Sequence, residues 1–251
     1  SFESPVTWRL DLDGAEHLAP LITGIAFRGV TNGPSPDWMA RRLEAIGQRP
    51  ISALVDITNY VMFDLGRPLH AYDIDKIHGD ELVVRQATGG EPFAALNEKT
   101  YEMEAGMITI GDAEGVDDLA GVMGGERTGV IDDTTGMFLE IAVFDPISVA
   151  TTGRKLNLNS DARYRFERGL DSESPVWAAG HIARMVTEIC GGEASVPVTM
   201  GPGVDWKRSI FLGSGKVESL TGMKIDTAEQ QRILEALGFT VTSADCGFDV
   251  A

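Results

Sequence analysis

The sequence predicts an α+β fold in which mixed or antiparallel sheets pack against helices, followed by a small, truncated α+β module. Residues 81–144 contain short alternating segments separated by Gly, Asp, Asn and Glu turns, as strands do. Residues 35–47, 51–66 and 175–190 instead repeat apolar residues at three- and four-residue spacing, which is typical of amphipathic helices. A Pro- and Gly-rich stretch at 196–204 predicts a linker before the last module.

The composition indicates how large a core the chain can build and argues against several kinds of binding partner. With 251 residues, 43% of them apolar, the chain can build one large core and a small second domain. A formal charge of −17 argues against autonomous, non-specific binding to nucleic acid. The two cysteines, Cys190 and Cys246, lie far apart, which favours a reduced, cytoplasmic setting and argues against a zinc site. There is neither a signal-peptide pattern nor an apolar run of membrane-spanning length, so we expect no membrane partner.

Two predicted strands precede a well-marked helix. Residues 1–17 contain an alternating segment and look like the end of a preceding region, and residues 21–30 form the second strand candidate. Ser35 is a favourable N-cap and Pro36 suits the first helical position, so we expect a helix from there to Gly47. Its apolar face would comprise Trp38, Met39, Leu43 and Ile46.

Residues 51–73 are the segment around which the rest of the chain is organised. Their first half has a helical apolar stripe, and Gly66 supplies the left-handed position that ends a helix. A short strand is expected directly afterwards. Asn59 on the helix and His70 just past it would therefore form one wall of a binding pocket. A capped core helix followed by a core strand with an incidental histidine is an alternative of equal weight.

The remaining elements alternate between strands and helices. Asp145 and Pro146 open a predicted helix, and the helix at 175–190 is bounded by Ser174 and by glycines after it. In the last module, Thr227 is the predicted cap of a helix. The further strand candidates begin near Leu82, Phe93, Lys99, Met107 and Met137.

Glu140 is an unusual carboxylate because it interrupts the apolar run MFLEIAVF. A charge inside a buried strand is unfavourable unless it is paired or used. The functional interpretation is a hydrogen-bond acceptor on the floor of a pocket. The alternative, of similar weight, is that strand alternation points Glu140 to solvent while Leu139 and Ile141 face inward.

Common enzyme signatures are absent, including a dinucleotide-binding glycine pattern, a P-loop, a GxSxG elbow and an HExxH helix. The pairs Asp117-Asp118 and Asp132-Asp133 could in principle bind a metal ion. Each pair is expected in a turn, where aspartate commonly accepts local backbone hydrogen bonds. We therefore assign no metal site.

Residues 154–169 form the one basic block of an acidic chain. Contact with phosphate groups would explain it. The alternative is a solvated helix flank with ion pairs such as Arg163 or Arg165 with Glu167. The candidates for such phosphate contact are Arg154, Lys155, Arg163 and Arg165.

Four segments occur in an order and at a spacing that resemble a known family. They are VDITNYVMFDLGRPLHAYD, LAGVMGGE, LEIAVFDP and SDARYRFERGLD. Together they resemble the tRNA-editing domain of the bacterial phenylalanyl-tRNA synthetase β subunit. The resemblance covers residues 18–200. Residues 1–17 look like the end of the preceding part, and residues 201–251 are similar to the start of the following small module.

The resemblance implies hydrolytic editing, in which mischarged Tyr-tRNA(Phe) is deacylated. Such a second site is useful because a pocket for phenylalanine rejects a hydroxyl-bearing analogue by only ~10²-fold. The family implies tRNA(Phe) and a catalytic α subunit as partners, in a heterotetramer of two α and two β subunits. It also places the ATP and magnesium sites elsewhere in the full enzyme. We therefore expect no cofactor in this chain and no aminoacylation by it.

The resemblance further implies roles for single residues. Glu140 would receive the tyrosine hydroxyl, while Gly121 and Ala162 would leave room for the ring. Asn59 and His70 match pocket-wall positions near the ester, where His70 would polarise or hold the attacking water, or merely orient the substrate.

Two positions depart from the family pattern. Ser160 stands where many relatives carry threonine and keeps the hydroxyl. Arg163-Tyr164 stands where relatives often have Ser-His, which leaves open how the terminal adenosine is held. A non-catalytic domain that binds tRNA or scaffolds the catalytic subunit is the competing hypothesis, supported by the basic block and the small tail module.

Overall fold

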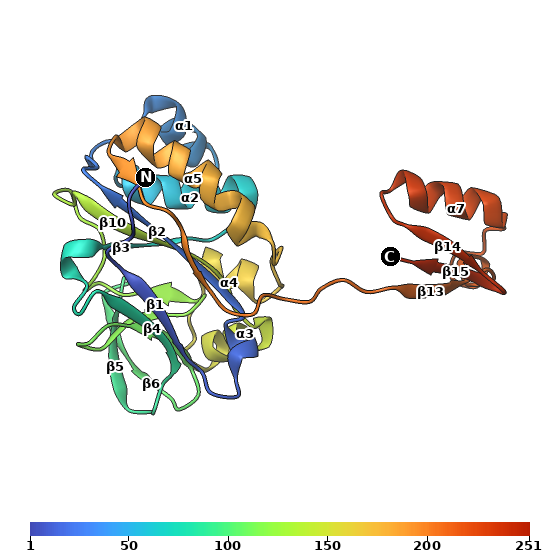
Figure 1. Cartoon of the computed structure of the whole chain (residues 1–251), viewed down its shortest axis with the longest axis horizontal. Helices are drawn as coiled ribbons and strands as arrows, with labels where there is room; N and C mark the ends of the chain where they lie inside the picture. Colours follow the sequence, from blue (N-terminus) through green and yellow to red (C-terminus); the bar gives the residue numbers. More distant parts are fainter. The chain divides into compact units, whose positions relative to one another are not determined.

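Two five-stranded sheets form the framework of the first of two units into which the chain divides (Figure 1). The computed structural model describes residues 1–251. The first unit is Ser1–Val204 and the second is Asp205–Ala251. The predicted α+β class, with mixed and antiparallel sheets, is confirmed.

The first sheet is mixed. Only its first two strands are parallel to each other, with Trp8 opposite Leu82, and the other neighbours are antiparallel. A separate hairpin pairs β5 (Glu91–Ala95) with β6 (Lys99–Met103). In sheet order the strands are β1 (Thr7–Asp11), β4 (Glu81–Gln86), β7 (Ile108–Gly111), β8 (Val116–Leu119) and β9 (Met123–Gly124).

The second sheet is antiparallel and is centred on its longest strands. The order is β11 (Glu193–Ala194), β2 (Leu21–Arg28), β10 (Gly136–Val143) and β3 (His70–Asp73), and β12 (Val198–Met200) also pairs with β2. Strand β10 therefore lies between β2 and β3 along much of its length.

Helices α1 (Asp37–Ala45), α2 (Ala53–Leu65) and α5 (Ser174–Cys190) cover one face of the second sheet (Figure 1). Two further helices follow β10, namely α3 (Pro146–Lys155) and α4 (Asp161–Phe166). Short 3-10 turns occupy Glu16–Leu18 and Ile74–Lys76. Gly66 ends α2 at φ 67°, as the expected left-handed cap residue. None of the helices has the length and apolar character needed to cross a membrane.

Both faces of β10 are buried, and this decides where Glu140 lies. Leu139 and Ile141 belong to the core beneath the helices, whereas Phe138 and Ala142 belong to the core between the two sheets. Glu140 alternates with Leu139 and Ile141, so it faces the core between the two sheets, and it is only 5% exposed. The alternative in which Glu140 points to solvent is wrong, because a strand covered on both sides has no solvent face.

The structure corrects several predictions about local elements. Residues 1–17 are part of the first unit, because β1 pairs with β4. The expected linker contains a strand, since Val198–Met200 pairs with β2. Asp117 and Asp118 lie within β8 and are buried, whereas Asp132-Asp133 does form a turn.

The predicted first helix also differs at its start and on its apolar face. Helix α1 begins after Pro36, and the Ser35 hydroxyl donates to Asp56 instead of capping. Met39 and Leu43 are buried as expected, but Trp38 and Ile46 are 40% and 53% exposed.

The second unit is a three-stranded antiparallel sheet with two helices. In chain order it comprises β13 (Ile210–Gly213), α6 (Lys216–Thr221), α7 (Thr227–Ala236), β14 (Val241–Ala244) and β15 (Gly247–Val250). Strand β15 lies in the centre. Asp226 caps α7 by accepting from the Glu229 amide, so the predicted Thr227 cap is off by one residue.

Candidate functional site

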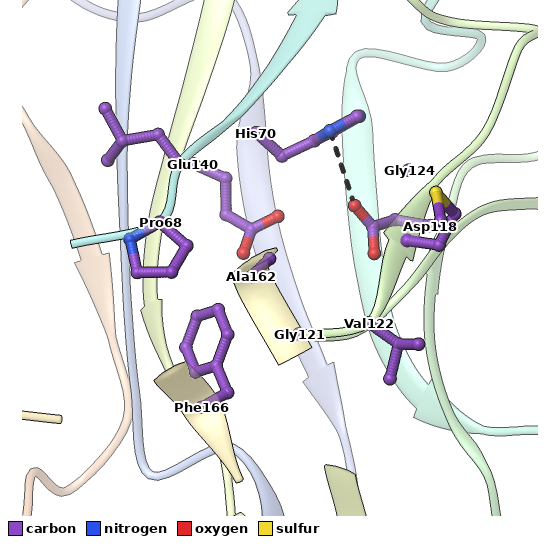
Figure 2. A pocket seen from close by; sticks show the side chains of 11 residues that line it. Pro68, His70, Asp118, Gly121, Val122, Gly124, Glu140, Ala162 and Phe166 are labelled. Carbon is purple, nitrogen blue, oxygen red and sulfur yellow. Dashed lines mark ion pairs between the residues drawn. The ribbon is translucent and has the colours of Figure 1, made fainter. Parts of the chain in front are cut away.

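A small pocket opens where the two sheets of the first unit approach each other. Its walls come from the start of β3, from β10, and from the β8–β9 region, and α4 closes one side (Figure 2). His70, Asp118 and Glu140 supply the ionisable groups, and the other lining residues are apolar or small. The volume is about 70 Å³.

His70 and Glu140 meet because their strands are neighbours. They are directly opposed in the register of β3 and β10, and directly opposed residues project from the same face of a sheet. Both side chains line the pocket (Figure 2). His70 and Glu140 are 70 positions apart in the sequence, and the pairing of β3 with β10 brings them together.

The absence of a side chain at Gly124 leaves the space that the His70 imidazole occupies. A Cβ atom at Gly124 would lie 2.2 Å from Cε1 and 2.6 Å from Nδ1 of His70, which is impossible without displacement of the ring. Burial lowers the pKa of His70 to about 4, so the imidazole is neutral at pH 7. Its Nε2 atom is buried and has no hydrogen-bond partner.

Glu140 is held by a hydrogen bond and by a nearby cation. The Tyr72 hydroxyl donates to Oε2 of Glu140 over 3.2 Å. Burial raises the pKa of Glu140 to about 7, and the Tyr72 hydrogen bond and the Arg67 guanidinium act in the opposite direction. Arg67 is itself buried, donates to the carbonyl oxygen of Ala142 and lies 5.6 Å from the centre of the Phe166 ring.

Asp118 is a pocket residue that the sequence interpretation missed. It lies on β8, is 4% exposed, and approaches Nδ1 of His70 to 3.6 Å through Oδ2. The preceding residue, Asp117, points the other way and pairs with Arg127 at 2.6 Å and with the Thr128 hydroxyl at 3.1 Å. These contacts anchor β8 behind the pocket. The two acids are consecutive, so the segment lacks the apolar–polar alternation that would have indicated a strand.

The small residues of the predicted site lie at the pocket for different reasons. Gly121 lines it with φ 70°, a backbone conformation that favours glycine, and a Cβ there would press on Phe144 and Val149 at 3.0 Å. Ala162 also lines the pocket, from α4. Ser160 does not line it. Its hydroxyl caps α4 by accepting from the Arg163 amide and donates to the carbonyl oxygen of Val122, which is a pocket residue.

Asn59 is not brought to the pocket. It is half-buried on α2 and is absent from the lining, although His70 lies only a few residues further along the chain. Helix α2 packs against the opposite face of the sheet from the one that carries Glu140. The helix–strand turn therefore places Asn59 and His70 on different sides of the second sheet.

The basic block is largely engaged in internal contacts. Arg163 bonds to Glu167 at 3.0 Å and to Asn159 at 2.9 Å, and its side chain is 11% exposed. Arg165 lies 4.8 Å from the centre of the Phe63 ring. Lys155 pairs with Glu104, while Arg154 is exposed. Of the four predicted phosphate contacts, Arg154 is the most available to a ligand.

The arrangement provides an acceptor and a neutral imidazole in a small enclosed space. No serine, threonine or cysteine lines the pocket, so these side chains offer no nucleophile there. The buried carboxyls can accept hydrogen bonds from hydroxyl or ammonium groups. The neutral imidazole can hold a water molecule through Nε2.

Comparison with known proteins agrees with the resemblance seen in the sequence. A family model described as B3/4 domain matches residues 18–191. The chain is 48% identical over 238 residues to the phenylalanine–tRNA ligase β subunit of Ruegeria pomeroyi, covering 95% of this chain. It is also 48% identical over 240 residues to the β subunit of Cereibacter sphaeroides.

The chain spans about 30% of the length of these curated relatives. Among solved structures, an N-terminal fragment of the phenylalanyl-tRNA synthetase β subunit from Pyrococcus horikoshii is similar over the whole chain and 69% of its own length. The TM-score is 0.50 and the identity 15%, so this likeness concerns the fold. The resemblance predicted from the four sequence segments is confirmed, and the chain belongs to the B3/4 domain family.

Proposed function

We propose that this chain is an editing module that hydrolyses the ester of mischarged Tyr-tRNA(Phe) within a phenylalanine–tRNA ligase β subunit. The observation that carries the proposal is the buried Glu140 carboxylate facing a pocket beside a neutral His70. Its natural partners are tRNA(Phe) and a catalytic α subunit. The chemistry needs no ATP and no metal ion from this chain.

Glu140 would select tyrosine by its phenol hydroxyl. Its Oε2 atom already accepts a hydrogen bond from the phenol hydroxyl of Tyr72. Its Oε1 atom can accept a hydrogen bond from a second phenol hydroxyl. Phenylalanine would leave a buried acceptor unpaired. That deficit corresponds to about 1–3 kcal/mol, or more when the acceptor is charged.

The pocket must expand to admit the ring. Its volume of about 70 Å³ is half of the ~150 Å³ that an apolar cavity needs to hold benzene. Met123 is a lining residue on the two-residue strand β9 and is half-buried. An unbranched methionine changes rotamer readily, so its displacement is the simplest way to make room.

His70 would position the attacking water instead of acting as a strong base. With a pKa of about 4 the imidazole is a poor proton acceptor at pH 7. Its unpartnered Nε2 can nevertheless accept a hydrogen bond from water. An aminoacyl ester is already activated, so correct placement of water accounts for much of the acceleration. No covalent enzyme intermediate is required.

The test compares hydrolysis of Tyr-tRNA(Phe) and Phe-tRNA(Phe) by the chain and by Glu140→Ala. We expect the wild type to prefer the tyrosyl ester, and the variant to lose about 10-fold or more of that preference. Thermal melting of both proteins controls for folding. Full selectivity in Glu140→Ala would remove Glu140 as the acceptor. Binding of tRNA(Phe) without any turnover by the wild type would favour the non-catalytic alternative.

A further inference from the structure

Asp118 is a buried carboxyl that the proposed hydrolysis does not use. It lines the pocket, is 4% exposed, and accepts no hydrogen bond from the protein. Nδ1 of His70 lies 3.6 Å from its Oδ2 atom, which exceeds hydrogen-bonding distance. The carboxyl therefore keeps acceptor capacity at the pocket for a group supplied from outside.

Two acidic side chains line the pocket, whereas Arg67, the cation that acts on Glu140, is not part of the lining. Asp118 and Glu140 approach the shared space from different walls, and no lysine or arginine is part of the lining (Figure 2). Arg67, the buried cation near Glu140, donates to Ala142 and lies against Phe166, and its Nη2 atom has no hydrogen-bond partner. Burial and the neighbouring Glu140 raise the pKa of Asp118 well above its usual range. A positively charged ligand beside Asp118 would favour the ionised form of its carboxyl.

An aminoacyl ester has two recognisable polar ends beside its ester. The phenol lies at the far end of the side chain, and a free α-ammonium lies next to the ester carbonyl. Two separate carboxyls suit a ligand that donates hydrogen bonds at both ends. His70 lies beside Asp118, so an ammonium at Asp118 would bring the ester to the imidazole that holds the water.

We propose that Asp118 receives the α-ammonium of the aminoacyl ester and thereby sets the position of the ester relative to His70. The inference rests on the proposed editing function for the identity of the substrate. It makes Asp118 a substrate-binding residue, and it assigns to the site a requirement for an unmodified α-amino group. Peptidyl-tRNA and N-acylated aminoacyl-tRNA would accordingly be excluded.

The contacts behind β8 support this role. Asp117 pairs with Arg127 at 2.6 Å and so fixes the strand from its other face. Gly124, opposite Asp118 in the register of β8 and β9, leaves the space in which the His70 ring sits. The Asp118 carboxyl is thus held in place by backbone pairing and not by bonds of its own, which keeps its oxygens available to a ligand.

Two matched probes test the proposal without requiring turnover. L-tyrosinamide carries the α-ammonium, and desamino-tyrosinamide has hydrogen in its place. Binding of each to the full chain is measured by ligand-observed NMR or calorimetry, for the wild type and for Asp118→Asn. We expect the wild type to bind L-tyrosinamide about 10- to 100-fold more tightly than the desamino probe, and Asp118→Asn to remove most of that difference.

Each outcome decides the matter. Equal binding of the two probes by the wild type overturns the proposal, as does a full preference retained in Asp118→Asn. The wild-type comparison stands even if the variant folds poorly, and Asp118→Glu, which keeps the charge, should retain part of the preference. Tighter binding of L-tyrosinamide than of the desamino probe, without any hydrolysis of Tyr-tRNA(Phe), would contradict the editing function and leave the assignment of Asp118 as the ammonium-binding residue intact.

Discussion

Replacing Glu140 by glutamine should stabilise the chain in mildly alkaline solution and change its stability little in acid. Glu140 lies in the core between two sheets, and burial raises its pKa from 4.5 to about 7. The unfolded chain therefore releases this proton at lower pH than the folded chain does. The free energy of unfolding of the wild type therefore falls as the pH rises from 4.5 to 7, and the whole loss of stability caused by Glu140 is present above pH 7.

The size of the effect follows from the displacement of the pKa. A rise from 4.5 to about 7 corresponds to about 3 kcal/mol, because each pH unit is worth about 1.4 kcal/mol. Glutamine has nearly the same shape and can still accept the Tyr72 hydroxyl, so the hydrogen bond survives. We therefore expect a gain on the order of 3 kcal/mol above pH 7 that fades towards pH 4.5.

The assay is urea unfolding of the first unit, followed by circular dichroism at several pH values. The groups that face Glu140 also titrate or carry charge, namely His70, Tyr72, Asp118 and Arg67. The lowered pKa of His70 makes the wild type more stable as the pH rises from 4 to 6.5, opposite to the effect of Glu140. Only the difference between variant and wild type isolates Glu140.

The matched control is Glu102→Gln, which removes one carboxylate from the exposed side of β6. It accounts for the change in net charge. A difference between Glu140→Gln and wild type that stays constant across the pH range would refute the reasoning. It would mean that Glu140 ionises as readily in the folded chain as in water.

Three further changes test the geometry of the site. Gly124→Ala should displace His70 and destabilise the chain by about 1–3 kcal/mol. The control, Gly180→Ala, lies on the exposed face of α5, where an added Cβ meets nothing within 4 Å, and it should stabilise the chain slightly. Equal shifts in melting temperature for the two variants would contradict this reasoning. His70→Ala should slow single-turnover deacylation of Tyr-tRNA(Phe) by about 100-fold, and an unchanged rate would exclude His70 from the mechanism. Ser160→Ala should cost about 1 kcal/mol in urea unfolding through the lost cap of α4, and no loss would show that the cap is dispensable.

Local signals in the sequence were sufficient for the elements that bring His70 into place. The apolar stripe, Gly66 and Pro68 predicted a helix, its end and a strand, and α2 and β3 follow that plan. The same segments carried the family resemblance. Glu140 was identified as exceptional because a charge in an apolar run is conspicuous without any knowledge of the fold.

Local patterns could not reveal which faces are covered. Successive residues of β10 face different cores, and only the presence of a second sheet shows that Glu140 is buried. Asp118 was assigned to a turn because aspartate favours turns, yet pairing of β8 with its neighbours overrode that preference. The basic block predicts Arg163 as a phosphate contact, but Glu167 and Asn159 accept hydrogen bonds from it.

The sequence by itself determined the order of the elements and the family, and it singled out Glu140 as a charge in an apolar run. The tertiary structure decided that His70 and Glu140 are neighbours across two strands, that Asp118 joins them, and that Asn59 lies apart. The physical reason is that helix periods and caps are properties of a few consecutive residues. A pocket instead arises from backbone pairing between distant strands, which determines the face on which each side chain lies.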